Sequence, residues 1–109
     1  MKIYMYGTDL DNDFCFGEIE VKETKMMYKS ADDSWMSPAC LRQVRKNDEG
    51  IVRDCDTLRP CIFFTERQDE LAQARLHDFY MVRYNRLVLE AEQEKLQANK
   101  IVGMPKKCE

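Results

Sequence analysis

Residues 65–99 read TERQDELAQARLHDFYMVRYNRLVLEAEQEKLQAN and contain neither Gly nor Pro. The stretch is dominated by Ala, Leu, Glu, Gln, Arg and Lys, which have high helix propensity. Thr65 and Gln68 match a capping box, in which the Thr hydroxyl caps the helix and the Gln side chain reaches back. The sequence therefore predicts one long helix over residues 65–100.

This helix is longer than the domain that the chain can build. At 1.5 Å per residue it would extend roughly 50 Å, whereas a compact chain of this size has a diameter of roughly 34 Å. After Leu89 the helix has few apolar side chains, chiefly Ala91 and Leu96. We therefore expect its second half to project, to fray, or to pack against another chain.

The first 64 residues are predicted to form a sheet. Alternation of apolar and polar residues, together with short apolar runs between turn signals, indicates strands over residues 2–6, 14–24, 25–29, 51–54 and 61–64. Ser37 and Pro38 resemble a helix start and predict a short helical turn over residues 38–42. The fold class is α+β: a small, mostly antiparallel sheet of four or five strands with one long C-terminal helix. Residues 1–109 are expected to be a single domain that ends in a flexible tail, 101–109.

Composition limits the class of protein. Hydrophobic residues make up 44% of the chain and the net charge is −3, so the whole chain is not disordered. No apolar run approaches ~18 residues, so no membrane span is expected. The five cysteines include no C-x-x-C pair, and no signal peptide is apparent, which favours reduced thiols in the cytoplasm.

Two features could carry chemistry. Asp9, Asp11 and Asp13 alternate as in a calcium loop, but Phe14 stands where that loop needs its sharp-turn Gly, so an acidic turn is the interpretation. His77 is the only histidine, and the spacings of hydrolase, metalloprotease and nucleotide-binding motifs are missing. We therefore expect no enzyme activity, no catalytic residue, no metal and no cofactor.

Charge and aromatic residues point instead to a contact surface. Residues 1–36 carry a balance of −4, and such an acidic face could meet a basic groove on a partner protein, although charge alone favours a simple role in solubility. Trp35 and Met36 stand in a polar loop and are candidate contact anchors, or a lid on the sheet. The predicted partner-binding residues are Asp9, Asp11, Asp13, Glu18, Glu20, Trp35 and Met36.

A cluster of four basic residues suggests a different hypothesis, in which the chain is a regulator that contacts nucleic acid. The cluster consists of Arg42, Arg45, Lys46 and Arg53. Four cations are too few to neutralise a long phosphate track, and the chain as a whole is negative. These two features argue against direct, sequence-independent binding of nucleic acid.

Three short features resemble small accessory proteins of phages and other mobile elements of gut bacteria. They are Lys2-Ile3-Tyr4 at the start, the Glu18-Ile19-Glu20-Val21 strand, and Phe64-Thr65-Glu66-Arg67 before a long charged helix. In size and style the chain is similar to anti-CRISPR proteins that act on Cas9. The resemblance implies a non-enzymatic inhibitor in the cytoplasm of a bacterial host, whose partner is a host protein such as Cas9 or its guide-RNA complex. It assigns no site residue, and the net charge of −3 departs from that of strongly acidic DNA mimics. The alternative is a self-associating accessory protein that forms a homodimer through the long helix.

Overall fold

The computed structural model describes residues 1–109 apart from 12, 40, 56–57, 102, 106 and 108–109. The chain divides into two compact units, Met1–Phe79 and Tyr80–Glu109. The first unit holds the sheet and the first turns of the helix, and the second holds the rest of the helix.

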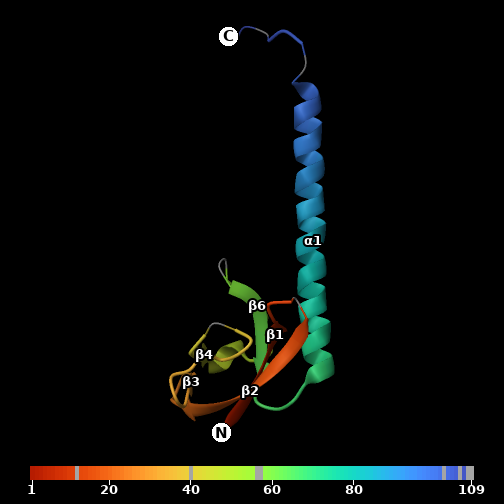
Figure 1. The fold of residues 1–109 in the computed structure, drawn as a ribbon. Helices are drawn as coiled ribbons and strands as arrows, with labels where there is room; N and C mark the ends of the chain where they lie inside the picture. The colour runs from red at the N-terminus through yellow and green to blue at the C-terminus, as the bar shows by residue number, and fades with distance from the viewer. Residues whose placement is uncertain (12, 40, 56–57, 102, 106, 108–109) are drawn as a thin grey trace. The chain divides into compact units, whose positions relative to one another are not determined.

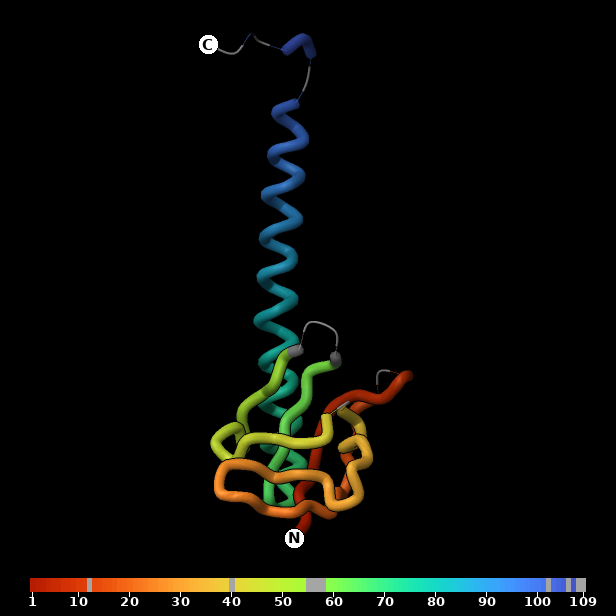
Figure 2. The backbone as a smooth tube through the Cα atoms, turned by 90° about the vertical axis from the view of Figure 1, so that its left-hand side faces the viewer, coloured from red at the N-terminus to blue at the C-terminus, as the bar shows by residue number. Residues whose placement is uncertain are grey.

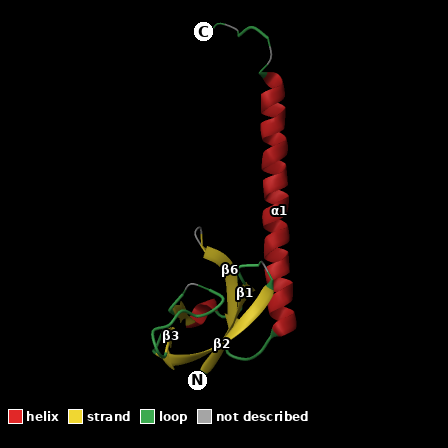
Figure 3. Cartoon of the chain, viewed as in Figure 1, coloured by secondary structure: helices red, strands yellow, loops and turns green. Residues whose placement is uncertain are grey.

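The first unit is built on a curled six-stranded sheet whose strand pairings are all antiparallel (Figures 1 and 3). Its strand order is β4-β3-β2-β1-β6-β5. The α+β class is confirmed, but the prediction of four or five strands is wrong, because the short β4 went unrecognised. The strands are β1 (Lys2–Thr8), β2 (Phe14–Glu23), β3 (Met27–Ser30), β4 (Gln43–Arg45), β5 (Arg53–Cys55) and β6 (Leu58–Phe64).

The register of the β1–β2 hairpin shows which residues lie on each face of the sheet. It pairs Ile3 with Ile19 and Tyr6 with Phe16, so alternate residues of each strand project to opposite sides. One face, here the inner face, carries Ile3, and the other, the helix face, carries Tyr6. The tube in Figure 2 shows β3 and β4 running beside each other, as their pairing requires.

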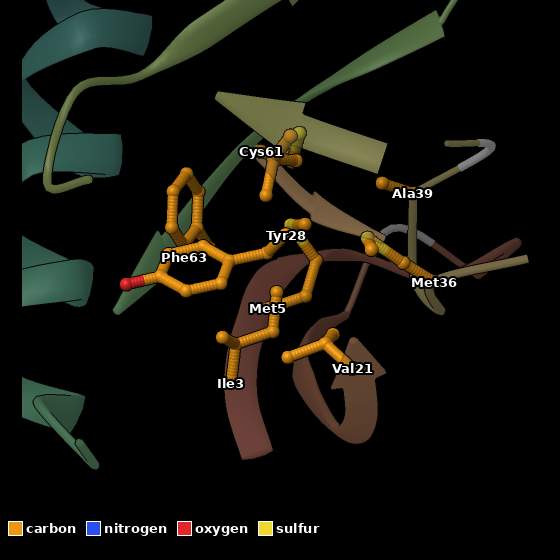
Figure 4. Close-up of a cluster of buried hydrophobic side chains, with 9 residues drawn as sticks. Ile3, Met5, Val21, Tyr28, Met36, Ala39, Cys61 and Phe63 are labelled. Carbon is orange, nitrogen blue, oxygen red and sulfur yellow. The ribbon is translucent and has the colours of Figure 1, made fainter. Parts of the chain in front are cut away.

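The inner face carries the larger core. The side chains of this core come from five strands and from the segment that follows β3, and those labelled in Figure 4 converge on one another. Tyr28 and Phe63 meet edge to face with ring centroids 6.1 Å apart. The buried members of this core are Ile3, Met5, Val21, Tyr28, Met36, Ala39, Val44, Cys61 and Phe63.

The helix face is covered by the start of α1 (Asp69–Lys100). Ala72 and Leu76, four residues apart on the helix, pack against Tyr6, Ile62 and Phe64 of the sheet. These five side chains are all buried. The aromatic run at the end of β6 is thus divided between the two faces, because neighbouring residues of a strand point in opposite directions.

The helix begins at Asp69, four residues after the predicted start. The predicted capping box does not form, because Thr65 N and Oγ1 both donate to Glu49 Oε2, at 3.1 and 3.0 Å. Gln68 N donates instead to Tyr6 Oη at 2.9 Å. Asp69 and Glu70 provide the negative charge that a helix N-terminus favours.

In the second unit, the helix carries apolar side chains that are open to solvent. Val82, Leu89 and Leu96 are 70%, 56% and 63% exposed, and they recur at intervals of seven residues. Within the described residues, no helix combines the length and apolar character needed to cross a membrane.

The helical turn predicted over residues 38–42 is wrong for the residues described there, which form a turn without helix. The peptide bond between Ser37 and Pro38 is cis. Met36 N donates to Leu41 O at 2.7 Å, which closes the segment into a loop. The loop buries Ala39 in the inner-face core.

Candidate functional site

A groove lies between β2 and the loop that follows β3. Its volume is roughly 460 Å³. We call it the β2 groove. One wall is the segment Gly17–Glu20, and the other is the loop. The lining residues are Gly17, Glu18, Ile19, Glu20, Ala31, Asp32, Ser34, Trp35 and Ser37. Three of the predicted partner-binding residues, Glu18, Glu20 and Trp35, are therefore brought together here.

The groove exists because the chain turns away from the sheet after β3. Asp32 Oδ1 accepts hydrogen bonds from the backbone N and the Oγ of Ser34, at 3.1 and 2.5 Å, and from Ser30 Oγ at 3.0 Å. Asp33 adopts a positive φ of 57°, which reverses the chain direction. The hydrogen bonds from Ser34, and then the one from Ser30, lower the pKa of Asp32 below its ordinary value, so this carboxylate is ionised at neutral pH.

A glycine lets the loop approach the sheet. A Cβ built on Gly17 would lie 2.1 Å from Ser37 O, a backbone atom that cannot move aside alone. Only a residue without a side chain permits this contact. Gly17 thus determines how closely the loop sits against β2, and with it the width of the groove.

Trp35 is the aromatic residue of the groove. Its side chain is 57% exposed, and the Arg42 guanidinium lies over its ring at 4.4 Å from the centroid. Met36, by contrast, is fully buried in the inner-face core. Met36 is therefore not an exposed contact anchor, contrary to the prediction. The two residues are neighbours in a loop that points one side chain outward and one inward, so Met36 holds the loop down while Trp35 faces solvent.

The two glutamates of β2 already attract cations. Glu18 Oε1 lies 3.1 Å from Lys2 Nζ, and Glu20 Oε1 accepts a hydrogen bond of 3.0 Å from the Met1 ammonium group. Both acids remain about half exposed. Exposed pairs of this kind contribute little to stability, so their carboxylates can be shared with another cation.

The remaining predicted acids lie in the loop between β1 and β2. Asp9 Oδ1 accepts hydrogen bonds from Asp11 N and Asp13 N, at 2.9 and 3.0 Å. Ligand oxygens of these three acids lie within 4.8 Å of one another. The Asp9 hydrogen bonds account for the loop conformation. Asp9, Asp11 and Asp13 are not among the groove-lining residues.

Two aromatic side chains of β2 are partly exposed on the helix face of the sheet. Phe14 and Phe16 are 49% and 43% exposed, and Arg67 lies over the Phe16 ring at 4.4 Å from its centroid. Phe16 also contacts Tyr6, with ring centroids 5.7 Å apart. Both rings are therefore only partly covered.

The basic residues, the histidine and the cysteines considered in the sequence do not form a second site among the described residues. Within the predicted basic cluster, Arg42 lies over Trp35, and Lys46 forms a 2.6 Å ion pair with Glu23. His77 is exposed on α1, with its Nδ1 3.7 Å from Asp78 Oδ1. Of the cysteines, Cys15 is half-buried and Cys61 is buried, while the side chain of Cys55 lies outside the described residues.

Sequence reasoning missed three residues that build the groove: Gly17, Asp32 and Ser37. A signal for Gly17 was present, because a glycine inside an alternating strand marks close approach of another backbone. A signal for Asp32 was also present in the Asp-Asp-Ser run, which favours side-chain turns. Nothing in the sequence indicated that Ser37 would lie over Gly17.

Neither a protein-family model, nor a curated protein, nor a solved structure matches this chain.

Proposed function

We propose that this chain is a non-enzymatic protein-binding module, and that its β2 groove receives a basic segment of a partner protein. The observation that carries the proposal is the composition of the groove. Three acidic residues, Glu18, Glu20 and Asp32, line it together with the exposed Trp35.

Such a set recognises Lys and Arg side chains. Carboxylates accept charge-assisted hydrogen bonds from ammonium and guanidinium groups, and the face of an indole ring attracts cations. The ring of Trp35 already has the Arg42 guanidinium over it, a contact of this kind within the chain itself. Acidic surfaces also accelerate encounters with basic partners.

As the specific partner we propose Cas9 or its guide-RNA complex, on the basis of the sequence resemblance to anti-CRISPR proteins. In that case the chain acts as an inhibitor by occupying a basic surface of the nuclease. Neither the fold nor the groove is particular to that partner, so the resemblance alone supports this choice.

A cleavage assay with purified Cas9 tests the inhibitor. The chain at saturating concentration should suppress DNA cutting, and the double variant Glu18→Lys/Glu20→Lys should restore it by reversing the charge of the groove. Glu92→Lys is the control, because it reverses one such charge at an exposed position of α1 that is not among the groove-lining residues. Unchanged cutting in the presence of the native chain would reject Cas9 as the target.

The binding module is tested separately by calorimetry with a lysine-rich peptide. We expect micromolar-range binding that weakens as salt is raised, since exposed charges are screened. Trp35→Ala and the double lysine variant should each weaken it, and Glu92→Lys should not. Equal binding by all four proteins would contradict the assignment of the groove.

One observation favours self-association as a second function. Val82, Leu89 and Leu96 are exposed at a seven-residue interval, which is a repeat that helices use to pair. Sedimentation at several concentrations should show a dimer, and Leu89→Glu should make the chain monomeric. A native chain that stays monomeric at high concentration would remove this candidate.

A further inference from the structure

We infer that the partner segment binds in the β2 groove as an added β-strand, paired with the outer edge of β2 at Phe16 and Glu18. This inference rests on the proposed function and adds the conformation of the bound segment.

The hydrogen bonds at both ends of the β1–β2 hairpin fix these directions. Val21 N donates to Met1 O, and Asp9 N donates to Asp13 O. In an antiparallel pair, directly bonded positions alternate with non-bonded ones. The register between the two ends therefore points the N–H and C=O groups of Gly17 and Ile19 toward β1, and those of Phe16, Glu18 and Glu20 away from it.

β3 uses only the C-terminal part of this outward row. It pairs with β2 at Val21–Glu23, and Ala31 N donates to Glu20 O at 3.0 Å. The Asp32 turn then takes the chain off the sheet. In the described part of the chain, no backbone group pairs with the outward N–H and C=O groups of Phe16 and Glu18.

The N–H and C=O groups of Phe16 and Glu18 thus lack a strand partner among the described residues, at the place where β3 would have continued. Unpaired edge groups of this kind are a template for another strand, and peptide recognition by strand addition uses them. The β2 groove lies along the same segment, and the loop bearing Trp35 forms its far wall. The space beside the edge is therefore open to a chain.

Charge selects the occupant. Two copies of this chain that joined edge to edge would bring their own glutamates together, and like charges opposite one another in a sheet are destabilising. An extended segment with Lys or Arg at alternate positions would instead place its cations beside Glu18 and Glu20. Its apolar residues could contact the exposed ring of Phe16. The occupant is accordingly a basic, alternating segment of a partner protein.

Amide hydrogen exchange by NMR tests the edge in the native chain alone. The amides of Phe16 and Glu18 should exchange at least about tenfold faster than those of Gly17 and Ile19, which bond to β1. Equal protection of all four amides would overturn the inference without any ligand, because the edge would then already be paired.

A synthetic heptapeptide of alternating Lys and Val, blocked at both ends, tests the pairing. On binding, it should protect the Phe16 and Glu18 amides. A version that is N-methylated at alternate residues keeps the charges but loses donors, and should bind roughly three- to tenfold more weakly for each hydrogen bond removed. Binding that leaves these amides unprotected, and that is indifferent to methylation, would overturn strand addition but leave the basic-segment module intact. Absence of binding by the unmethylated peptide would overturn both.

Discussion

Tyr6 Oη donates a 2.6 Å hydrogen bond to Asp69 Oδ1 and accepts one of 2.9 Å from Gln68 N. Tyr6 lies at the centre of the sheet and is fully buried, whereas Asp69 is the first residue of α1. Arg67 holds the same carboxylate through Nη2 at 2.6 Å. One phenol therefore connects the sheet with the start of the helix, and it satisfies a helix N-terminal N–H that a cap would otherwise serve.

Tyr6→Phe should destabilise the first unit by about 1–2 kcal/mol, because it removes both hydrogen bonds and leaves the Gln68 N–H without its acceptor. Urea unfolding followed by circular dichroism measures the change. Tyr84→Phe is the matched control, since that side chain is 60% exposed, and its effect should stay within about 0.5 kcal/mol. Equal stability of the two variants would refute a structural role for the Tyr6 phenol.

Stability should fall in acid partly through Asp69. Its hydrogen bond from Arg67, and then that from Tyr6, hold the pKa of this carboxyl below its ordinary value of 3.8. Below pH 3.8 the unfolded chain therefore takes up a proton that the folded chain still resists. The contribution of Asp69 is present in full above that pH, and it is lost as the pH falls through the lowered pKa.

The variant Asp69→Asn isolates this contribution. Its free energy of unfolding should depend less steeply on pH than that of the native chain below about pH 4, because the titrating group is gone. Asp78→Asn is the control, since that side chain is 84% exposed. Parallel pH profiles for the native chain and Asp69→Asn would show that the carboxylate makes no differential contribution.

The sequence carried enough information for the first two strands, for β6 and for the long helix. The first two strands alternate apolar and polar residues, β6 contains an apolar run between Pro60 and Thr65, and the helix is rich in residues of high helix propensity. It failed where one tertiary contact overrides a local signal. Thr65 was an acceptable helix cap in isolation, but Glu49, distant in sequence, binds its hydroxyl and backbone N–H. The helix then begins at Asp69, next to the phenol that replaces the cap.

Only some of the residues that line the groove were predicted, for a similar reason. Glu18, Glu20 and Trp35 are recognisable by type, as acids and an aromatic residue in polar surroundings. Their meeting depends on a turn at Asp32 and on contact between Gly17 and Ser37, which are twenty residues apart. A short β4 of three residues, Gln43–Arg45, has no periodicity of its own to detect.

Gly17→Ala should widen or distort the groove. The added methyl group would lie 2.1 Å from Ser37 O, so the loop or β2 must move, at a cost of about 1–3 kcal/mol. Peptide binding should weaken together with stability. Gly103→Ala is a comparison, because nothing lies within 4 Å of its added Cβ, although its φ of +73° is itself unfavourable for alanine. A Gly17→Ala chain with native stability and native binding would show that the loop does not rely on this close approach.

Cys15 should react slowly with alkylating reagents. Burial raises the pKa of its thiol above the ordinary value of 9.0, and the carboxylates of Asp9 and Asp13 raise it further, so the reactive thiolate is scarce at neutral pH. Asp13→Asn should accelerate alkylation of Cys15 by a factor of about two, because it removes one charge while burial, the larger cause, stays. Peptide mass spectrometry after timed iodoacetamide treatment follows this one cysteine among the five. Asp78→Asn, on α1, should leave the rate unchanged. If Asp13→Asn also left it unchanged, the acidic loop would exert no field at the thiol, and burial alone would account for the slow reaction.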